Sequence, residues 1–128
     1  MSEIKRLPDS ELEIMMIIWG AGKPVTSAFI MENLREGKNW ANTTVLNFLN
    51  RLVDRGFLRT ARQGRFNYYE PLVKESEYLQ KESKSFLERM HIGSLKSFVA
   101  ALYDGDAIDE EDLAELKKYV EEISNKYK

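Results

Sequence analysis

Residues 42–69 read NTTVLNFLNRLVDRGFLRTARQGRFNYY and combine a helical pattern with a hairpin pattern. In the first part, apolar side chains recur at the spacing of one buried helix face, and they are Val45, Phe48, Leu49 and Leu52. Gly56 stands where a left-handed residue would end this helix, so we place the helix at about 42–55. Two short β-prone runs then flank Gln63-Gly64, which predicts a hairpin with a basic tip.

The opposite side of this predicted helix is polar, yet it carries none of the Glu or Lys residues that usually keep a helix soluble. Its polar residues include Thr43, Thr44, Asn47, Asn50 and Arg51. An Asn amide suits the N6/N7 edge of adenine, an Arg suits O6/N7 of guanine, and a Thr contacts a thymine methyl or a phosphate. We therefore predict that this face reads DNA bases; the alternative is a merely solvated face, which better helix formers would serve more stably. Leu46 lies between the two faces and could contact a thymine methyl or pack beneath Phe57.

Five arginines fall within residues 51–65 against a single aspartate, which makes this segment locally basic. They are Arg51, Arg55, Arg59, Arg62 and Arg65. The last three would lie on the hairpin, where cations contact backbone phosphates and position a protein without specifying sequence. We predict this role above all for Arg62 and Arg65; the alternative is an exposed hairpin kept soluble by its charge. Tyr68 and Tyr69 alternate faces, so at least one of them should be buried.

Two further helices precede this stretch. The first covers about 9–19, ends at Gly20 and Gly22, and has the apolar positions Leu12, Met15, Met16 and Trp19. After an extended link at 23–25, Thr26 or Ser27 caps a second helix with the apolar positions Ala28, Ile30, Met31 and Leu34; a turn follows at 37–39. A winged helix-turn-helix has this order of elements: helix, short strand, helix, helix and hairpin. We therefore place a winged helix-turn-helix domain at 1–72.

After Pro71 the pattern is helical throughout, with helices expected at 74–90, at 94–103 and from Asp109 onward. In the last helix, the apolar residues are spaced 3, 4, 3, 4, as in a coiled-coil seam, and they are Leu113, Leu116, Val120, Ile123 and Tyr127. Helices this short seldom hold together alone in water. We therefore predict a three-helix dimerisation domain at 73–128 whose interface also includes Leu95, Phe98 and Leu102. The alternative is a tail that folds back on the winged domain; either way, the fold class is mainly α with a small β-hairpin wing.

The composition argues against several other functions. The 128 residues have a net charge of −2, no cysteine and a single histidine, His91, so they offer no thiolate metal site and no Cys or paired-His catalysis. We expect no enzymatic activity, no catalytic residue, no cofactor and no metal. No apolar run approaches the roughly 20 residues that span a bilayer, and the amino terminus lacks a signal-peptide pattern. We expect a cytoplasmic protein that does not insert into a membrane.

Taken together, these segments resemble the penicillinase-repressor family, which is related to copper-responsive repressors. The resemblance lies in LPDSELEIMMIIWG at 7–20, KNWANTTVLNFLNRLVDRGFLRTARQGRFNYYEPLV at 38–73 and IDEEDLAELKKYVEE at 108–122. It implies a cytoplasmic homodimeric repressor with winged-helix heads and three-helix dimerisation tails, which binds inverted-repeat operators upstream of β-lactam resistance or related envelope-stress genes. By position, Thr43, Thr44, Asn47 and Arg51 inherit the base-reading role.

The same resemblance implies a release mechanism, in which a membrane sensor of β-lactam triggers cleavage of an Asn-Phe bond in the dimerisation domain. That bond corresponds to Ala101-Leu102 here, where neither residue type matches. The copper-responsive branch carries paired Cys motifs, and this sequence has none, so copper sensing is not expected. The usual capping Ser or Thr before the first helix is replaced by Pro8, with Asp9 or Ser10 available instead.

Two other functions remain open at the level of sequence. One is a winged-helix regulator of the MarR or PadR kind, controlled by a small ligand, which would need a pocket among Tyr78, Phe86, Phe98 and Leu102. The other is a protein-interaction adaptor that keeps the winged fold without binding DNA. The arginines beside an Asn- and Thr-rich face favour DNA binding over the adaptor.

Overall fold

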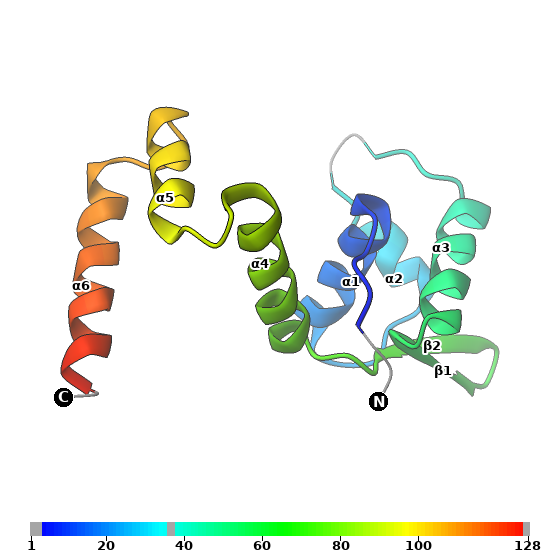
Figure 1. Ribbon diagram of the computed structural model, residues 1–128. Helices are drawn as coiled ribbons and strands as arrows, with labels where there is room; N and C mark the ends of the chain where they lie inside the picture. Colours follow the sequence, from blue (N-terminus) through cyan, green and yellow to red (C-terminus); the bar gives the residue numbers. More distant parts are fainter. Residues whose placement is uncertain (1–3, 36–37, 127–128) are drawn as a thin grey trace. The chain divides into compact units, whose positions relative to one another are not determined.

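The computed structural model describes residues 4–35 and 38–126, and the chain divides into two compact units, Met1–Glu82 and Ser83–Lys128. The first unit contains α1 (Asp9–Ala21), α2 (Ser27–Glu32), α3 (Asn42–Asp54), β1 (Leu58–Gln63) and β2 (Phe66–Pro71). Helix α4 (Glu75–His91) begins in the first unit and ends in the second, which also holds α5 (Leu95–Asp104) and α6 (Glu110–Lys126). Figure 1 shows α1, α2 and α3 grouped beside the hairpin.

Helix α1 buries part of the stripe that the sequence predicted, since Met15 is buried and Leu12 and Trp19 are half-buried against the core. Ile14, Met15 and Ile18 are fully buried, whereas Met16 is 44% exposed. The reason is that 14–19 is apolar all the way round, so spacing alone does not select a face. The expected cap by Asp9 or Ser10 is also wrong, because Pro8 occupies the N-cap without a side-chain hydrogen bond and its carbonyl accepts the N–H of Leu12 at 2.9 Å.

The short helix α2 starts as predicted and ends early. The hydroxyl of Thr26 accepts the backbone N–H of Phe29 at 3.2 Å, which caps the helix, and Ile30 is its buried residue. Leu34 lies beyond the end of α2, although it packs against the core, and Ala28 is exposed. The predicted turn at 37–39 lies partly outside the described residues.

Helix α3 and the hairpin form where the sequence predicted a helix and a hairpin. Helix α3 buries Val45, Leu49 and Leu52, and Gly56 follows it with φ +83°, the left-handed conformation that glycine adopts without strain. The hairpin turns at residues 64–65 rather than 63–64, since Gln63 still pairs with Phe66 in the antiparallel register. The extended link before α2 joins the sheet edge through Val25 and Tyr69, whose backbones exchange hydrogen bonds of 3.1 and 2.7 Å.

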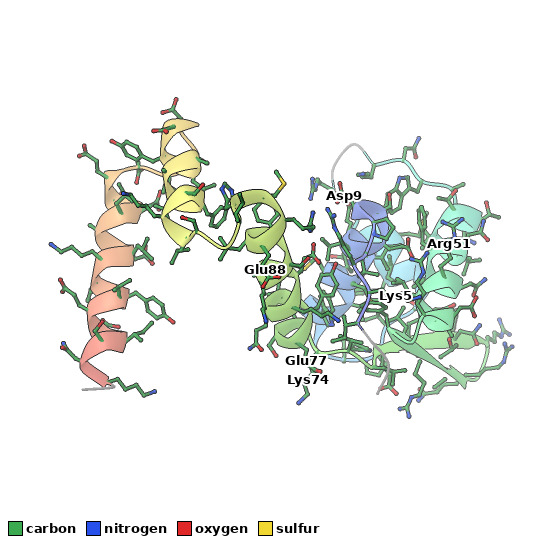
Figure 2. The ribbon with its side chains drawn as sticks, viewed as in Figure 1. Lys5, Asp9, Arg51, Lys74, Glu77 and Glu88 are labelled. Carbon is green, nitrogen blue, oxygen red and sulfur yellow. The ribbon has the colours of Figure 1, made fainter. Side chains whose placement is uncertain are left out.

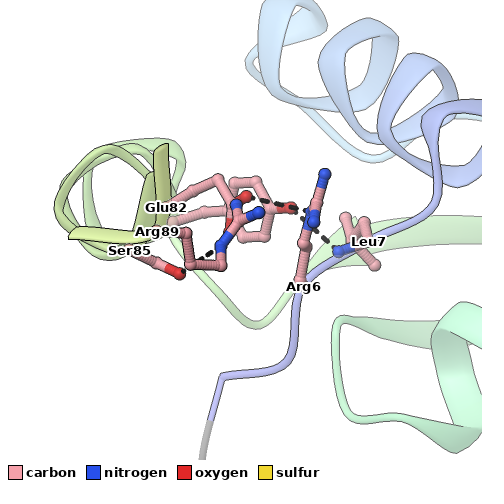
Figure 3. A network of polar contacts seen from close by, with 6 residues as sticks. Arg6, Leu7, Glu82, Ser85 and Arg89 are labelled. Atoms are coloured by element: carbon pink, nitrogen blue, oxygen red, sulfur yellow. Dashed lines mark hydrogen bonds and ion pairs between the residues drawn. The ribbon is translucent and has the colours of Figure 1, made fainter. Parts of the chain in front are cut away.

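The first unit continues past the predicted boundary at residue 72 because the start of α4 completes its core. Tyr78 is 2% exposed, its hydroxyl accepts the backbone N–H of Leu7 at 2.9 Å, and its ring packs on Trp19 and Phe57. The indole N–H of Trp19 in turn donates to the carbonyl of Val73 at 2.9 Å. An ion pair of 3.1 Å between Arg6 and Glu82 ties the same segments together (Figure 3). Burial raises the pKa of Tyr78 above its usual 10.0.

The second unit consists of short helices with well-defined ends and little buried surface. Ser94 caps α5 by accepting the N–H of Ser97 at 3.1 Å. At the start of α6, where the sequence predicted a helix from Asp109 onward, Asp109 accepts the N–H of Asp112 at 2.9 Å, and Asp112 accepts the N–H of Asp109 at 3.0 Å. This reciprocal cap stabilises the charged form of the first carboxylate and holds the pKa of Asp109 below its usual value. Within the described parts of α5 and α6, no residue is fully buried.

Candidate nucleic-acid interface

The outer face of α3 is open to solvent and its polar groups are uncommitted. Thr43, Asn47 and Asn50 are exposed, and within the described part of the chain their side chains have no hydrogen-bond partner. Arg51 is exposed on the same helix (Figure 2), whereas Thr44 is half-buried at its flank. A row of amides and a guanidinium with no hydrogen-bond or carboxylate partner among the described residues suits recognition of an external polar surface, because binding then breaks no existing hydrogen bond.

The structure divides the five arginines into two groups. Arg55 donates to the buried carboxylate of Glu11 at 2.8 Å, and Arg59 pairs across the hairpin with Glu70. The second group, namely Arg51, Arg62 and Arg65, has no carboxylate partner among the described residues. Of these five arginines, the three available to a ligand are therefore Arg51, Arg62 and Arg65, whereas Arg59, which was also expected on the phosphate-contacting wing, is paired.

A groove of about 360 Å³ separates the start of α3 from the wing. Its lining comprises Thr26, Ser27, Ala28, Asn42, Leu46, Arg65, Phe66, Asn67 and Tyr69. Helix α3 has Ala41 at its N-cap, and no side chain caps the backbone N–H groups of its first turn, which carry the positive end of the helix dipole. Leu46 both packs against the core and lines this groove. An N-terminal dipole with Arg65 opposite makes the groove suitable for an anionic chain.

Asn42, Phe66 and Asn67 line the groove, although sequence reasoning did not select them. The register of the hairpin could have found Asn67, since it stands directly opposite Arg62 and shares its face. The same alternation puts Arg59 on the other face of the hairpin, next to Glu70 on the facing strand. The wing therefore presents different groups on its two sides.

The predicted dimer-interface residues of the second unit leave apolar surface uncovered. Leu95, Leu116, Val120 and Ile123 are exposed, with Val120 at 50%, while Phe98, Leu102 and Leu113 are half-buried. Tyr127 lies outside the described residues. An open apolar groove of about 550 Å³ runs between α5 and the start of α6, lined by Leu95, Lys96, Val99, Ala100, Tyr103, Asp104 and Leu113. The Ala101-Leu102 bond lies inside α5.

The four residues named for a small-ligand pocket are divided between the two units, with Tyr78 in the first and the other three in the second. Tyr78 is part of the core of the first unit, whereas Phe86 and Phe98 pack edge to face at 5.6 Å with His91 beside both rings. Nδ1 of His91 lies 2.8 Å from the hydroxyl of Ser97. In the described part of the chain, no group of three acidic, Cys or His side chains could hold a metal ion, and no helix is long and apolar enough to cross a membrane.

A helix-turn-helix with a polar, uncommitted outer face, followed by a two-stranded basic wing, defines the winged helix-turn-helix class of protein. Comparison with known proteins then identifies the family within this class. The model of the penicillinase repressor family matches residues 7–122. The chain is 34% identical over 128 residues to the penicillinase repressor of Bacillus licheniformis, covering 100% of this chain and 99% of that relative. The chain belongs to the penicillinase repressor family.

Other relatives agree with this assignment. The methicillin resistance regulatory protein MecI of Staphylococcus aureus (strain N315) is 27% identical over 111 residues, which cover 87% of this chain and 89% of MecI. The DNA-binding domain of the repressor BlaI, solved in solution, is 31% identical with a TM-score of 0.52, and the match covers 61% of this chain and 94% of that domain. Monomeric Bacillus licheniformis BlaI in complex with the blaP half-operator gives the same identity and coverage with a TM-score of 0.50. The family and the winged-helix fold predicted from the sequence are therefore confirmed.

Proposed function

We propose that this protein is a dimeric transcriptional repressor that binds an inverted-repeat operator in double-stranded DNA. The observation that carries the proposal is the uncommitted polar face of α3 beside two free wing arginines, Arg62 and Arg65. The relative solved on a half-operator, 31% identical to this chain, supports it. The proposal places the protein in the cytoplasm and assigns it no catalytic activity, cofactor or metal.

In this proposal, α3 enters the major groove and its side chains divide between two tasks. Base edges are read by Thr43, Thr44, Asn47, Asn50 and Arg51. Backbone phosphates are contacted by Arg62, by Arg65 and by the uncapped start of α3, which set the position of the head without reading sequence. Only the first set should distinguish the operator from other DNA.

Homodimerisation through the second unit is supported by its uncovered apolar seam. Leu116, Val120 and Ile123 recur on one side of α6 and remain exposed within the chain. Apolar stripes with 3-4 spacing bury themselves against a matching stripe, and a second copy of the chain supplies one. Two heads on one dimer then bind two half-sites, the second as an effectively intramolecular event.

Release is proposed to occur by cleavage in the second unit, through a pathway that includes a membrane sensor of β-lactam. A cut at Ala101-Leu102 would detach α6 and its seam from the head without touching any operator contact. The bond lies within α5, so α5 must open locally before a protease can bind this stretch in an extended form. Regulation of β-lactam resistance genes is part of the same proposal and rests on the family.

The test of operator binding is selection of DNA by the full-length protein from a library of random duplexes. We expect the selected sequences to converge on an inverted repeat, with affinity that falls steeply as salt is raised because phosphate-bound counterions are released. Val120→Glu should leave the head folded but yield monomers in sedimentation and weaker operator binding. If no sequence were selected, the proposed operator-binding repressor would be contradicted. If Val120→Glu remained dimeric, the proposed seam on α6 would be contradicted.

The test of release is incubation of the protein with extracts from β-lactam-treated and untreated cells of its own host, followed by fragment masses. Cleavage only in the treated extract supports the pathway, and the masses identify the bond. Full-length protein in both extracts, together with normal derepression in treated cells, would rule out proteolysis and favour a small ligand as the signal.

A further inference from the structure

Arg51 does not project from α3 alone, because an aromatic ring lies beside its guanidinium group. The guanidinium carbon is 5.8 Å from the centre of the Phe48 ring, one helical turn earlier. The Phe48 ring packs in turn on Trp40, with ring centres 5.3 Å apart and planes tilted by 58°. Both aromatic residues are half-buried, so each has one side on the core and the other toward solvent. We call Trp40 and Phe48 the aromatic shelf.

The shelf is held from its other end as well. Nζ of Lys38 lies 4.9 Å from the Trp40 ring centre and 3.7 Å from Oε1 of Glu13 on α1. Oε2 of Glu13 accepts the backbone N–H of Arg35 at 3.2 Å. A continuous set of contacts therefore runs from α1 through the segment before α3 to the shelf and on to Arg51.

We propose that the aromatic shelf positions the guanidinium of Arg51 for base recognition, with Phe48 as the positioning residue. A guanidinium within about 6 Å of a ring centre is attracted to the ring face. Bidentate recognition of guanine O6/N7 requires the planar guanidinium in a fixed orientation. Holding Arg51 over the ring before binding reduces the side-chain entropy lost on the DNA. This inference rests on the proposed function, because it requires that Arg51 reads a base.

The decisive comparison is between Phe48→Leu, which keeps apolar volume but removes the ring, and Phe48→Tyr, which keeps the ring. Fluorescence anisotropy with full-length protein measures affinity for the selected operator duplex and for a random duplex. We expect Phe48→Leu to weaken operator binding about two- to fivefold for each half-site engaged, the range of an exposed cation–π contact, and to leave random-duplex binding unchanged. Phe48→Tyr should bind as the wild type does.

Two controls separate positioning from packing. Phe29→Leu removes another half-buried ring of the same unit, one over which no cation lies among the described residues, and it should leave the ratio of operator to random affinity unchanged. In an Arg51→Ala background, Phe48→Leu should cause no further loss, because the group that it positions is absent. Thermal melts accompany each variant; should Phe48→Leu not fold, Phe48→Met takes its place, since it also keeps apolar volume and removes the ring.

The possible failures are distinguishable. Equal weakening of operator and random duplex by Arg51→Ala would overturn base reading by Arg51 itself. If Arg51→Ala weakened binding to the operator alone and Phe48→Leu bound the operator as tightly as the wild type, the positioning role of the shelf would be overturned. Base reading by Arg51 would then still stand. A Phe48→Leu loss that persists in the Arg51→Ala background would also overturn the shelf, since Phe48 would then act through packing.

Discussion

Shortening the chain to its first unit tests how far the DNA-binding head extends. We compare residues 1–82 with residues 1–73, the shorter piece that ends close to the boundary predicted from sequence. The longer piece keeps Tyr78 and the Arg6–Glu82 ion pair, and the shorter one loses both. We expect 1–82 to fold as a stable monomer, in line with the BlaI DNA-binding domain solved on its own, and 1–73 to be strongly destabilised.

The size of the effect follows from the contacts of Tyr78. Its ring is 2% exposed and packs on Trp19 and Phe57 at centroid distances of 5.7 and 6.0 Å, so removing it resembles an aromatic-to-Ala change of about 3–5 kcal/mol. The buried N–H of Leu7 also loses its acceptor, which costs about 1–3 kcal/mol more. A unit of this size has a total stability of about 4–12 kcal/mol. The truncation therefore removes a large part of the stability, or all of it.

Urea unfolding followed by tryptophan fluorescence and by circular dichroism measures this directly, because Trp19, one of the two tryptophans, contacts both Tyr78 and Val73. Within 1–82, Tyr78→Ala should reproduce most of the loss, and Tyr78→Phe should cost only the hydroxyl contact. Leu79→Ala serves as the matched control, because that neighbour is 46% exposed and should matter little. An unfolding midpoint for 1–73 equal to that of 1–82 would refute the assignment of α4 to the core of the head.

Three further outcomes are expected. Asn47→Ala should weaken operator binding by about 1–3 kcal/mol and random-duplex binding little. Arg62→Ala should weaken binding to both duplexes alike and reduce the slope of log affinity against log salt by about one. If Asn47→Ala weakened binding to both duplexes equally, Asn47 would not read a base. Arg55→Ala should destabilise the head by about 3 kcal/mol in urea unfolding, because Glu11, 1% exposed, is left as an unpaired buried carboxylate. The backbone N–H of residue 112 is the main group that lowers the pKa of Asp109. The stability that this cap gives α6 is therefore complete above the ordinary pKa of 3.8, and it is lost as the pH falls through the lower pKa of the folded state. Helicity measured by circular dichroism should thus fall in acid for the wild type, and the cap-dependent part of that fall should be absent in Asp109→Asn.

Features that depend on neighbouring residues could be predicted from the sequence. Thr26 and Asp109 cap their helices because each has a backbone N–H within reach three residues on, and Gly56 ends α3 because only glycine adopts φ +83° freely. The hairpin was predicted with its turn one residue early, since Gly64 alone did not show which of its neighbours belongs to the turn.

Features that depend on distant residues could not be predicted in the same way. The buried stripe of α1 is selected by what packs against it, and the apolar run at 14–19 left several stripes possible. The predicted boundary near residue 72 lies before the end of the first unit, because the hydroxyl of Tyr78 accepts the backbone N–H of Leu7, seventy-one positions earlier in the sequence. The sequence predicted a helix at 74–90 but did not indicate which unit the ring of Tyr78 would enter.

Local charge is also a tertiary property, and the arginines of 51–65 show why. Counting them along the sequence showed a locally basic segment, yet Glu11 and Glu70, which lie outside that segment, pair with two of the five. Glu11 fixes the end of α3 to α1, and Glu70 neutralises the root of the wing, so positive charge remains on α3 at Arg51 and toward the wing tip at Arg62 and Arg65. A head with fewer free cations binds random DNA more weakly, since non-specific affinity scales with the number of phosphates neutralised. Pairing two arginines internally therefore shifts the balance of binding from charge toward the uncommitted amides of α3, which is the balance that a sequence-specific repressor requires.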